Sequence, residues 1–355
     1  MFSDSKVQGK SFTSNTAKLL KHMDRLIDIQ TKKAVRPVML HVSPINACNL
    51  TCSFCCFANR SMKERLSLKQ MKTCISQFAE LGISGVEFTG GGEPTLHPNF
   101  NEIVEYCYNL GLKIGVCTNG AKLEKVSNWE YFSWCRLGLY GFYENYNYDL
   151  TRLRDKGVKI SAAYVWDEAI DTSTNPNITG DWLESSKKIL AKNFQDQSAF
   201  FKMFEWVEKE KIPTRIAFNA IKPVELVKND IQTIRGQIAE YERLNGALKY
   251  AFLSDFNFKG ERRNDHCFMH LVKPFLFTDG NVYACPSAEL SPENLTHVNQ
   301  EFKVCSWDEV TEVYGSIVKS GGGYLRNHNC SFCKYAMQNE LIDDIVTETE
   351  HNEFA

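Results

Sequence analysis

Hydrophobic and polar positions between residues 37 and 250 alternate between two patterns, short β-branched runs and longer segments with apolar residues at helical spacing. Strands are expected at PVMLHVSPI (37–45), VEFT (86–89), KIGVCTNG (113–120), CRLGLYG (135–141), KISAAYVW (159–166) and TRIAFNAI (214–221). Helices are expected between them at 67–82, near 98–110, near 122–132, and at 146–156, 181–210 and 224–245. The first helix has the clearest ends, with Ser67 as N-cap and Gly82 as its stop.

Six successive strand–helix units predict a parallel sheet with right-handed crossovers, either a partial barrel or an open sheet. In both architectures the ligand lies at the carboxyl ends of the strands, where the connecting loops gather. The sequence therefore directs attention to the loops that follow the expected strands.

The pattern changes near residue 250, which divides the chain into an N-terminal extension (1–36), an α/β core (37–250), a small C-terminal domain (251–340) and an acidic tail (341–355). The small domain is expected to be poor in regular structure and to need a metal as a staple. Its segment HLVKPFLFTDGNVYACP (270–286) predicts two short strands joined by an Asp-Gly turn. The tail is expected to fray.

Composition narrows the class of protein. The chain is 43% hydrophobic and 24% charged with a formal net charge of −2, as in a soluble enzyme without a general attraction to nucleic acid or anionic membrane. Neither a signal peptide nor an apolar span is evident, so we expect a cytoplasmic protein without a membrane partner. Thiols stay reduced there, and thirteen cysteines cannot all pair, so metal binding is favoured over disulfides.

The loop after the first expected strand carries Cys48, Cys52 and Cys55 in a C-x3-C-x2-C spacing. Three thiolates leave one corner of a cubane iron–sulfur cluster without a protein ligand, and an iron with an open site can bind a substrate or cofactor. A zinc site is the alternative, although zinc ribbons usually present a second C-x2-C pair nearby. Cys56, which follows directly, is expected to be a small buried side chain.

The loop after the second expected strand reads GGGEP, from Gly90 to Pro94. Glycine allows a close approach of backbone to ligand, and the carboxylate of Glu93 can accept hydrogen bonds from an ammonium group. A triple glycine alone is equally consistent with an ordinary loop.

Taken in this order, the cysteine motif, the aromatic Phe54 before the third cysteine and the GGEP loop resemble the radical S-adenosylmethionine (SAM) superfamily over about residues 37–250. The resemblance implies a partial (β/α)6 barrel in which Cys48, Cys52 and Cys55 hold a [4Fe–4S] cluster whose fourth iron is chelated by SAM. Reduction by a donor such as flavodoxin or ferredoxin would cleave SAM to a 5′-deoxyadenosyl radical, which abstracts hydrogen from the substrate.

The resemblance also implies which residues contact SAM. Gly91, Gly92 and Glu93 align with the motif for the methionine amino group, and Phe54 is expected near the adenine. Asn119 of TNG is a further candidate. Gly138 stands where many relatives carry a serine that contacts the ribose, and Ser161 is the expected replacement.

A second set of cysteines lies in the small domain and consists of Cys267, Cys285, Cys330 and Cys333. Four thiolates complete either a zinc site or a [4Fe–4S] cluster with no open corner. Appended to a radical SAM core, the set resembles the twitch domain, a shortened SPASM domain with one auxiliary cluster. Cys305 is expected to be a lone buried thiol.

The sequence leaves the substrate open. An auxiliary cluster could accept an electron during dehydrogenation of a small, aminocyclitol-like molecule, and the alternatives are modification or rearrangement of a nucleoside, of a nucleic-acid base or of a ribosomal peptide. KGERRNDH (259–266) is interpreted as a solvated charge run, and no acid–base pair stands out as a general base. A non-catalytic binding module with zinc at both cysteine sets is the alternative of another class.

Overall fold

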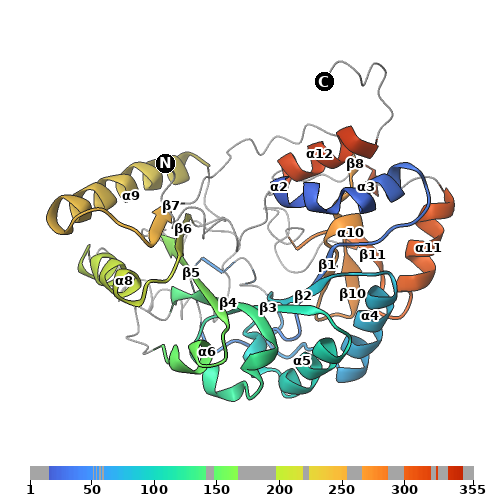
Figure 1. Ribbon diagram of the computed structural model, residues 1–355, viewed down its shortest axis with the longest axis horizontal. Coiled ribbons are helices and arrows are strands. Elements are labelled where there is room, and N and C mark those ends of the chain that lie inside the picture. Colours follow the sequence, from blue (N-terminus) through green and yellow to red (C-terminus); the bar gives the residue numbers. More distant parts are fainter. Residues whose placement is uncertain are drawn as a thin grey trace.

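The computed structural model describes residues 16–50, 52, 54–55, 57, 60–140, 148–166, 197–218, 224–253, 266–286, 300–320, 325–326 and 335–346. Its centre is a ten-stranded sheet with the strand order β11-β10-β9-β1-β2-β3-β4-β5-β6-β7 (Figure 1). The outer strands β11 and β7 do not pair with each other, so the sheet is curved but unclosed. This is the predicted α/β partial barrel.

Seven strands in chain order form the parallel part of the sheet, and they are β1 (Met39–Val42), β2 (Gly85–Phe88), β3 (Lys113–Thr118), β4 (Phe132–Gly138), β5 (Lys159–Trp166), β6 (Thr214–Phe218) and β7 (Ala251–Leu253). On its other side β1 pairs in parallel with β9 (Phe275–Leu276). β10 (Asn281–Tyr283) and β11 (Lys303–Ser306) continue the sheet antiparallel. A separate two-stranded sheet joins β8 (His266–Cys267) to β12 (Leu325–Arg326).

The helices named in Figure 1 are α2 (Thr16–Leu19), α3 (Met23–Gln30), α4 (Leu68–Glu80), α5 (Phe100–Asn109), α6 (Thr151–Arg154), α8 (Gln197–Glu210), α9 (Val224–Asn245), α10 (Met269–Val272), α11 (Val310–Ser320) and α12 (Ala336–Val346). α4 and α5 pack against each other over the strands β1 to β3, and α3 packs against α12 although they come from opposite ends of the chain. The N-terminal and C-terminal segments therefore meet.

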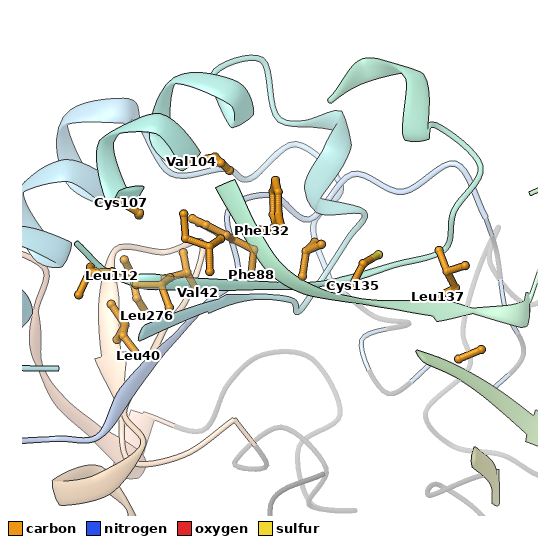
Figure 2. Packing of buried hydrophobic residues seen from close by; sticks show 14 of the residues in the cluster. Leu40, Val42, Phe88, Val104, Cys107, Leu112, Phe132, Cys135, Leu137 and Leu276 are labelled. Carbon is orange, nitrogen blue, oxygen red and sulfur yellow. The ribbon is translucent and has the colours of Figure 1, made fainter. Parts of the chain in front are cut away.

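One face of the sheet supplies the hydrophobic core. Successive strand residues point to opposite faces, and Val42, Phe88 and Leu137 belong to the face that packs under the helices (Figure 2). Val104 and Cys107 of α5 lie against the same layer. We call the opposite face of the sheet, which carries the alternate residues of each strand, the inner face.

Several expected elements are confirmed. α4 begins after the predicted cap, where Ser67 and Gln70 form a capping box, and Gly82 follows its end with φ +89°. The bounds of β5 coincide with the predicted segment, and α9 spans the predicted range. Asp279 and Gly280 form the predicted turn between β9 and β10.

The helix expected near 122–132 is wrong, because the chain forms two 3₁₀ turns there, Leu123–Lys125 and Trp129–Tyr131. Asn101 of α5 accepts a hydrogen bond from the backbone N–H of Ser127 and donates to the carbonyl of Lys125. These bonds satisfy backbone groups that a continuous helix would use within itself. β4 accordingly starts at Phe132, earlier than expected, and ends at Gly138.

Two further expectations need correction. The helix expected at 146–156 is reduced to α6, where Asp149 bonds the backbone N–H of Thr151 at 3.2 Å. The chain after 250 is richer in regular structure than expected, with α11, α12 and β11, and α12 runs to Val346 with Ile342 fully buried. Residues 341–346 are therefore packed helix, not a frayed tail.

No described helix has both the length and the apolar character needed to cross a membrane.

Candidate functional site

The first cysteine loop follows β1 and is held at its base by backbone hydrogen bonds. Asn46 N donates to Glu64 O at 3.0 Å, and Leu66 N donates to Pro44 O at 2.9 Å. Within the loop, Cys55 N donates to Cys52 O at 3.1 Å. Cys48, Cys52 and Cys55 are all half-buried, and none forms a disulfide with another described residue. The structure therefore places the three thiols on one short loop at the carboxyl end of β1, as predicted.

Nitrogen donors from different parts of the chain approach the sulfur atoms of this loop. The backbone N–H of Leu50 lies 3.5 Å from Cys48 Sγ, and Asn119 Nδ2 lies 3.8 Å from the same sulfur. Arg60 Nη1 is 3.4 Å from Cys55 Sγ. Burial raises the pKa of the Cys48 thiol, while the hydrogen bond from Leu50 acts in the opposite direction. Such donors stabilise the thiolate form that a metal needs.

These residues fit the iron–sulfur cluster that the motif implies. A cubane cluster takes thiolate ligands on separate irons, and N–H donors to the sulfurs tune it. The loop supplies the thiols, and Arg60, Asn119 and the backbone of Leu50 supply donors. Within the described ranges, no three His, Cys, Asp or Glu side chains lie close enough together to hold a single metal ion.

The glycine loop packs directly against the segment that leads into the cysteine loop. Gly91 N donates to Ser43 Oγ at 2.9 Å, and Glu93 N donates to Ala47 O at 2.9 Å. A Cβ atom on Gly92 would lie 2.1 Å from Ala47 O, and one on Gly91 would lie 2.1 Å from Asn46 Oδ1. The absence of a side chain at these positions is therefore required by the chain's own packing, before any ligand is considered.

Glu93 is almost fully buried, and its carboxylate is bonded on both oxygens by the protein. Oε1 accepts from Thr95 N at 3.1 Å, Thr95 Oγ1 at 2.8 Å and Thr118 Oγ1 at 2.6 Å, and Oε2 accepts from Asn119 N at 2.7 Å. Burial raises the pKa of Glu93, and these hydrogen bonds act against that shift. Glu93 thus ties the glycine loop to the end of β3. Its role toward SAM stays a prediction.

Asn119 links the third strand end to the cysteine loop. Its Nδ2 donates to Asn49 Oδ1 at 2.9 Å besides approaching Cys48, and its Oδ1 accepts from Ala121 N at 3.0 Å. The carboxyl ends of β1, β2 and β3 are therefore joined through Asn119 and Glu93. Both residues were singled out from the sequence, and the structure brings them together with the cysteine motif.

Phe54 contacts Tyr140, which follows β4, with ring centroids 4.9 Å apart in an edge-on arrangement. The same tyrosine explains Gly138, because a Cβ there would lie 2.4 Å from the Tyr140 ring. A serine at 138 would collide with that ring in its present position. Ser161 is buried and pairs in register with Arg136, whereas Ala163 pairs with Gly138. Ser161 therefore lies two residues nearer the start of β5 than Ala163, the residue beside Gly138. A ribose contact by Ser161 stays a prediction.

The second cysteine set is described in part. Cys267 ends β8, Cys285 follows β10 by two residues, and both are half-buried. Cys267 pairs in register with Leu325 of β12, which precedes the Cys330–Cys333 motif by five residues. Cys330 and Cys333 lie outside the described residues, as do Cys56 and residues 259–265 of the charge run. Cys305 is buried in the core beside Cys74 of α4 and Tyr314 of α11, as expected for a lone thiol.

Sequence reasoning missed a layer of polar residues on the inner face, directly below the loops. It contains His41, Glu87, Cys117, Arg136, Ser161, Arg215 and Lys273. The signal was available, since His41, Glu87 and Arg215 interrupt short apolar strands at positions that alternate with core residues. A parallel sheet covered on both faces would have continuous apolar strands.

Comparisons with known proteins agree with this geometry. Residues 42–161 match the model of the radical SAM superfamily. A segment of 84 residues is 37% identical to an S-adenosylmethionine-dependent nucleotide dehydratase of Selenomonas ruminantium, covering 24% of this chain and 30% of that protein. A segment of 90 residues is 39% identical to a GTP 3′,8-cyclase of Synechocystis sp., covering 24% of this chain and 27% of that one. The chain thus matches about a third or less of each relative.

Among solved structures, the complex of Streptococcus suis SuiB with its precursor peptide SuiA resembles this chain with a TM-score of 0.51 and 16% identity. The likeness covers 86% of this chain and 72% of SuiB, and it supports the fold alone.

The cysteine loop, the glycine loop and Asn119 all lie inside the residues of this α/β domain that match the radical SAM superfamily model.

Proposed function

We propose that the protein is a radical SAM enzyme in which Cys48, Cys52 and Cys55 hold a [4Fe–4S] cluster with one iron open to SAM. The observation that carries the proposal is the convergence of three strand ends on one loop. The sulfurs of that loop receive N–H donors from Leu50, Arg60 and Asn119. When bound, the cluster and SAM supply one electron and a 5′-deoxyadenosyl radical that takes a hydrogen atom from the substrate.

The residues around the loop would then position SAM. Gly91 and Gly92 place backbone without side chains where the methionine end of SAM is expected. Ser43 Oγ accepts from Gly91 N, and Glu93 accepts from Asn119 N, so the loop is tied to the ends of β1 and β3. Phe54, packed on Tyr140, offers an aromatic edge for the adenine, and Ser161 is the expected ribose contact. An external electron donor such as flavodoxin or ferredoxin completes the proposal.

The specific reaction that we propose is dehydrogenation of a small molecule. An auxiliary [4Fe–4S] cluster would be held by Cys267, Cys285, Cys330 and Cys333. The pairing of β8 with β12 supports this assembly, because it brings the chain before Cys330 beside Cys267. A fully ligated cluster can take the second electron, so that loss of one hydrogen atom and one proton leaves the substrate oxidised by two electrons. This auxiliary cluster belongs to the twitch domain inferred from the sequence.

A second candidate is a nucleotide substrate. Two relatives that match the radical SAM segment are named for nucleotide chemistry, one a nucleotide dehydratase and one a GTP cyclase. Their similarity covers about a quarter of this chain, so it supports the proposal without fixing the substrate. A peptide substrate, as in the SuiB complex, is a third outcome that the experiment below leaves open.

The proposal is tested by anaerobic purification, reconstitution with iron and sulfide, and assay of 5′-deoxyadenosine with SAM and dithionite. We expect about eight irons per chain, as for two cubane clusters, and release of 5′-deoxyadenosine. Cys48→Ala should abolish SAM cleavage, whereas Cys285→Ala should lower the iron content to about four and retain SAM cleavage. Cys305→Ala is the matched control, because that thiol lies in the core and should keep both clusters.

Two results would contradict the proposal. A colourless, zinc-loaded protein after reconstitution would support the non-catalytic binding module. Unchanged iron content in Cys285→Ala would remove the auxiliary cluster and leave only the SAM-binding site.

A further inference from the structure

The segment that leads from the cysteine loop to α4 carries an excess of positive charge. Residues 60–69 contain four basic side chains and one carboxylate, in a chain that has 43 acidic and 41 basic residues overall. The basic side chains are Arg60, Lys63, Arg65 and Lys69, and the carboxylate is Glu64. The excess is therefore local, and we call residues 60–69 the basic segment.

The basic segment is fixed directly beside the cysteine loop. Ile45 and Arg65 form an antiparallel bridge, so the segment runs back along the chain that enters the cysteine motif. Arg60 donates from Nε to Asn46 O at 2.7 Å, and its Nη1 lies 3.4 Å from Cys55 Sγ. The first residue of the basic segment thus contacts a proposed ligand of the cluster.

The positive charges of this segment point outward and its negative charge points inward. Lys63 and Arg65 are exposed, whereas Glu64 between them is half-buried, and its Oε2 accepts from Asn46 Nδ2 at 3.2 Å. Met62, which precedes them, is 44% exposed. None of the ion pairs between described residues includes Lys63 or Arg65. The surface beside the cysteine loop therefore presents free positive charge next to an apolar side chain.

The stability of α4 does not explain these charges. Lys69 is exposed in the first turn of α4, and that turn contains no acidic residue. Lys63 and Arg65 precede the cap Ser67 and so lie before the same end of the helix. The N-terminal end of a helix is the positive end of its dipole, where cations are unfavourable and carboxylates are favourable. An acidic partner that covered this surface would turn an unfavourable arrangement into a favourable one.

The position of the surface indicates which acidic partner it fits. The proposed cluster needs one electron from outside the chain, and the basic segment reaches its ligand Cys55 through Arg60. A protein docked on Lys63 and Arg65 would bring its own redox group next to the cysteine loop. A few exposed charges beside one apolar side chain suit the small interface of a transient redox complex, in which charge guides the encounter.

We propose that the basic segment is the docking surface for a small acidic electron carrier of the flavodoxin type. One electron leaves the flavin hydroquinone of the carrier and enters the proposed cluster, with no bond broken and no proton transferred. The inference rests on the proposed function, because it assigns the route by which the proposed cluster is reduced. Binding of the oxidised carrier can be measured without turnover.

The test mixes the anaerobic, SAM-loaded holoenzyme with flavodoxin hydroquinone in a stopped-flow instrument and follows oxidation of the flavin. We expect a second-order rate constant that falls as salt is added. The double substitution Lys63→Glu with Arg65→Glu should lower this constant about tenfold or more at low salt, and Lys63→Gln with Arg65→Gln should lower it less. Release of 5′-deoxyadenosine with dithionite should stay within about twofold of wild type, because this small reductant needs no docking surface.

The matched control is Lys113→Glu with Lys159→Glu. These lysines are exposed at the amino ends of β3 and β5, at the edge of the sheet opposite the cysteine loop. The control changes the net charge of the protein by the same amount as the charge reversal in the basic segment. Its rate constant with flavodoxin should stay within about twofold of wild type.

Three results would overturn the proposal. Wild-type holoenzyme that reacts with dithionite but not with flavodoxin hydroquinone would remove the docking surface. Equal slowing in the two charge-reversed proteins would show that only total charge acts. Binding of a short single-stranded RNA that is lost in Lys63→Glu with Arg65→Glu, at an unchanged rate with flavodoxin, would assign the surface to nucleic acid.

Two further measurements keep these outcomes distinct. If the charge reversal lowers the thermal midpoint, the glutamine pair decides, and an unchanged rate with flavodoxin in that pair overturns the proposal. Release of 5′-deoxyadenosine with dithionite tests the radical SAM proposal separately from docking. Failure of docking therefore leaves that proposal standing, and failure of that proposal leaves the binding of oxidised flavodoxin interpretable.

Discussion

Glu87 and Glu93 lie six residues apart, and the first is largely and the second almost fully buried, yet their environments are opposite. Glu93 accepts hydrogen bonds from four neutral groups, and burial raises its pKa. Glu87 lies among cations that hold its pKa at about 2. The loops at the strand ends are thus fixed by neutral donors to Glu93, whereas on the inner face below them His41, Lys273 and Arg136 act on the charge of Glu87. The first arrangement fixes the loops through hydrogen bonds, and the second keeps a carboxylate ionised.

The largest effect is expected at the tightest contact of the frame. Gly92→Ala places a methyl group 2.1 Å from Ala47 O and 2.5 Å from the Asn46 carbonyl carbon. These are backbone atoms, so the glycine loop or the cysteine loop must move, at a cost of about 3 kcal/mol. The anaerobic thermal midpoint should fall by about 4 °C, and SAM binding should be lost.

Gly236→Ala in α9 is the matched control for this substitution. Its Cβ meets no atom within 4 Å, and alanine is favoured over glycine inside a helix, so stability should rise by about 1 kcal/mol. If Gly92→Ala melted like wild type, the frame would be more compliant than its contacts indicate, and the contrast with the inner face would lose its basis.

A smaller loss is expected for Glu93→Gln. The amide retains one acceptor but turns an NH2 group toward donors such as Asn119 N or Thr118 Oγ1, which costs about 2 kcal/mol. The thermal midpoint should fall by about 3 °C, because the contact between the glycine loop and the end of β3 is weakened. Glu102→Gln, which removes an exposed carboxylate paired with Lys72, should change the midpoint little. Equal effects of the two substitutions would mean that Glu93 does not fix the loops.

The smallest effect concerns pH and tests the inner face. The pKa of Glu87 is about 2 when folded and near 4.5 when unfolded, so its ionised form stabilises the fold above pH 4.5. That stability is lost as pH falls toward the folded value, by about 1 kcal/mol between pH 6 and pH 4. The difference in thermal midpoint between wild type and Glu87→Gln should therefore narrow over this range. A constant difference would show that the surrounding cations do not act on Glu87 as the geometry indicates.

The sequence was a good guide where one pattern determined one element. Ser67 and Gly82 marked the ends of α4, and the β-branched run KISAAYVW marked β5. It failed near Ser127, where the competing hydrogen bonds come from Asn101 on α5 and are invisible to local periodicity. It also failed for residues 341–346, because the helix there depends on packing of Ile342 in the core beside α3, a long-range contact.

The candidate site divides in the same way. The cysteine motif and GGGEP could be found because their spacing is local. Arg136 and Arg215 could not be grouped from the sequence, since they are far apart in the chain and share one face of the sheet only through the register of β4, β5 and β6. The sequence predicted that the glycines allow a close approach of a ligand. The structure adds that Gly92 lacks a side chain because the carbonyl oxygen of Ala47 occupies the space where a Cβ would lie.

The pairing of β1 with β9 has a consequence for how the protein is made. Val42 pairs with Leu276 in this ladder. β1, which leads into the cysteine loop, therefore cannot complete its pairing until β9 has been synthesised, roughly 230 residues later. At ribosomal speeds that delay is roughly 10 to 50 s, during which β1 is an unpaired sheet edge next to three reduced cysteines. Iron delivered during this interval would meet a cysteine loop whose strand still lacks one partner, so assembly of the proposed cluster is expected to follow synthesis of β9.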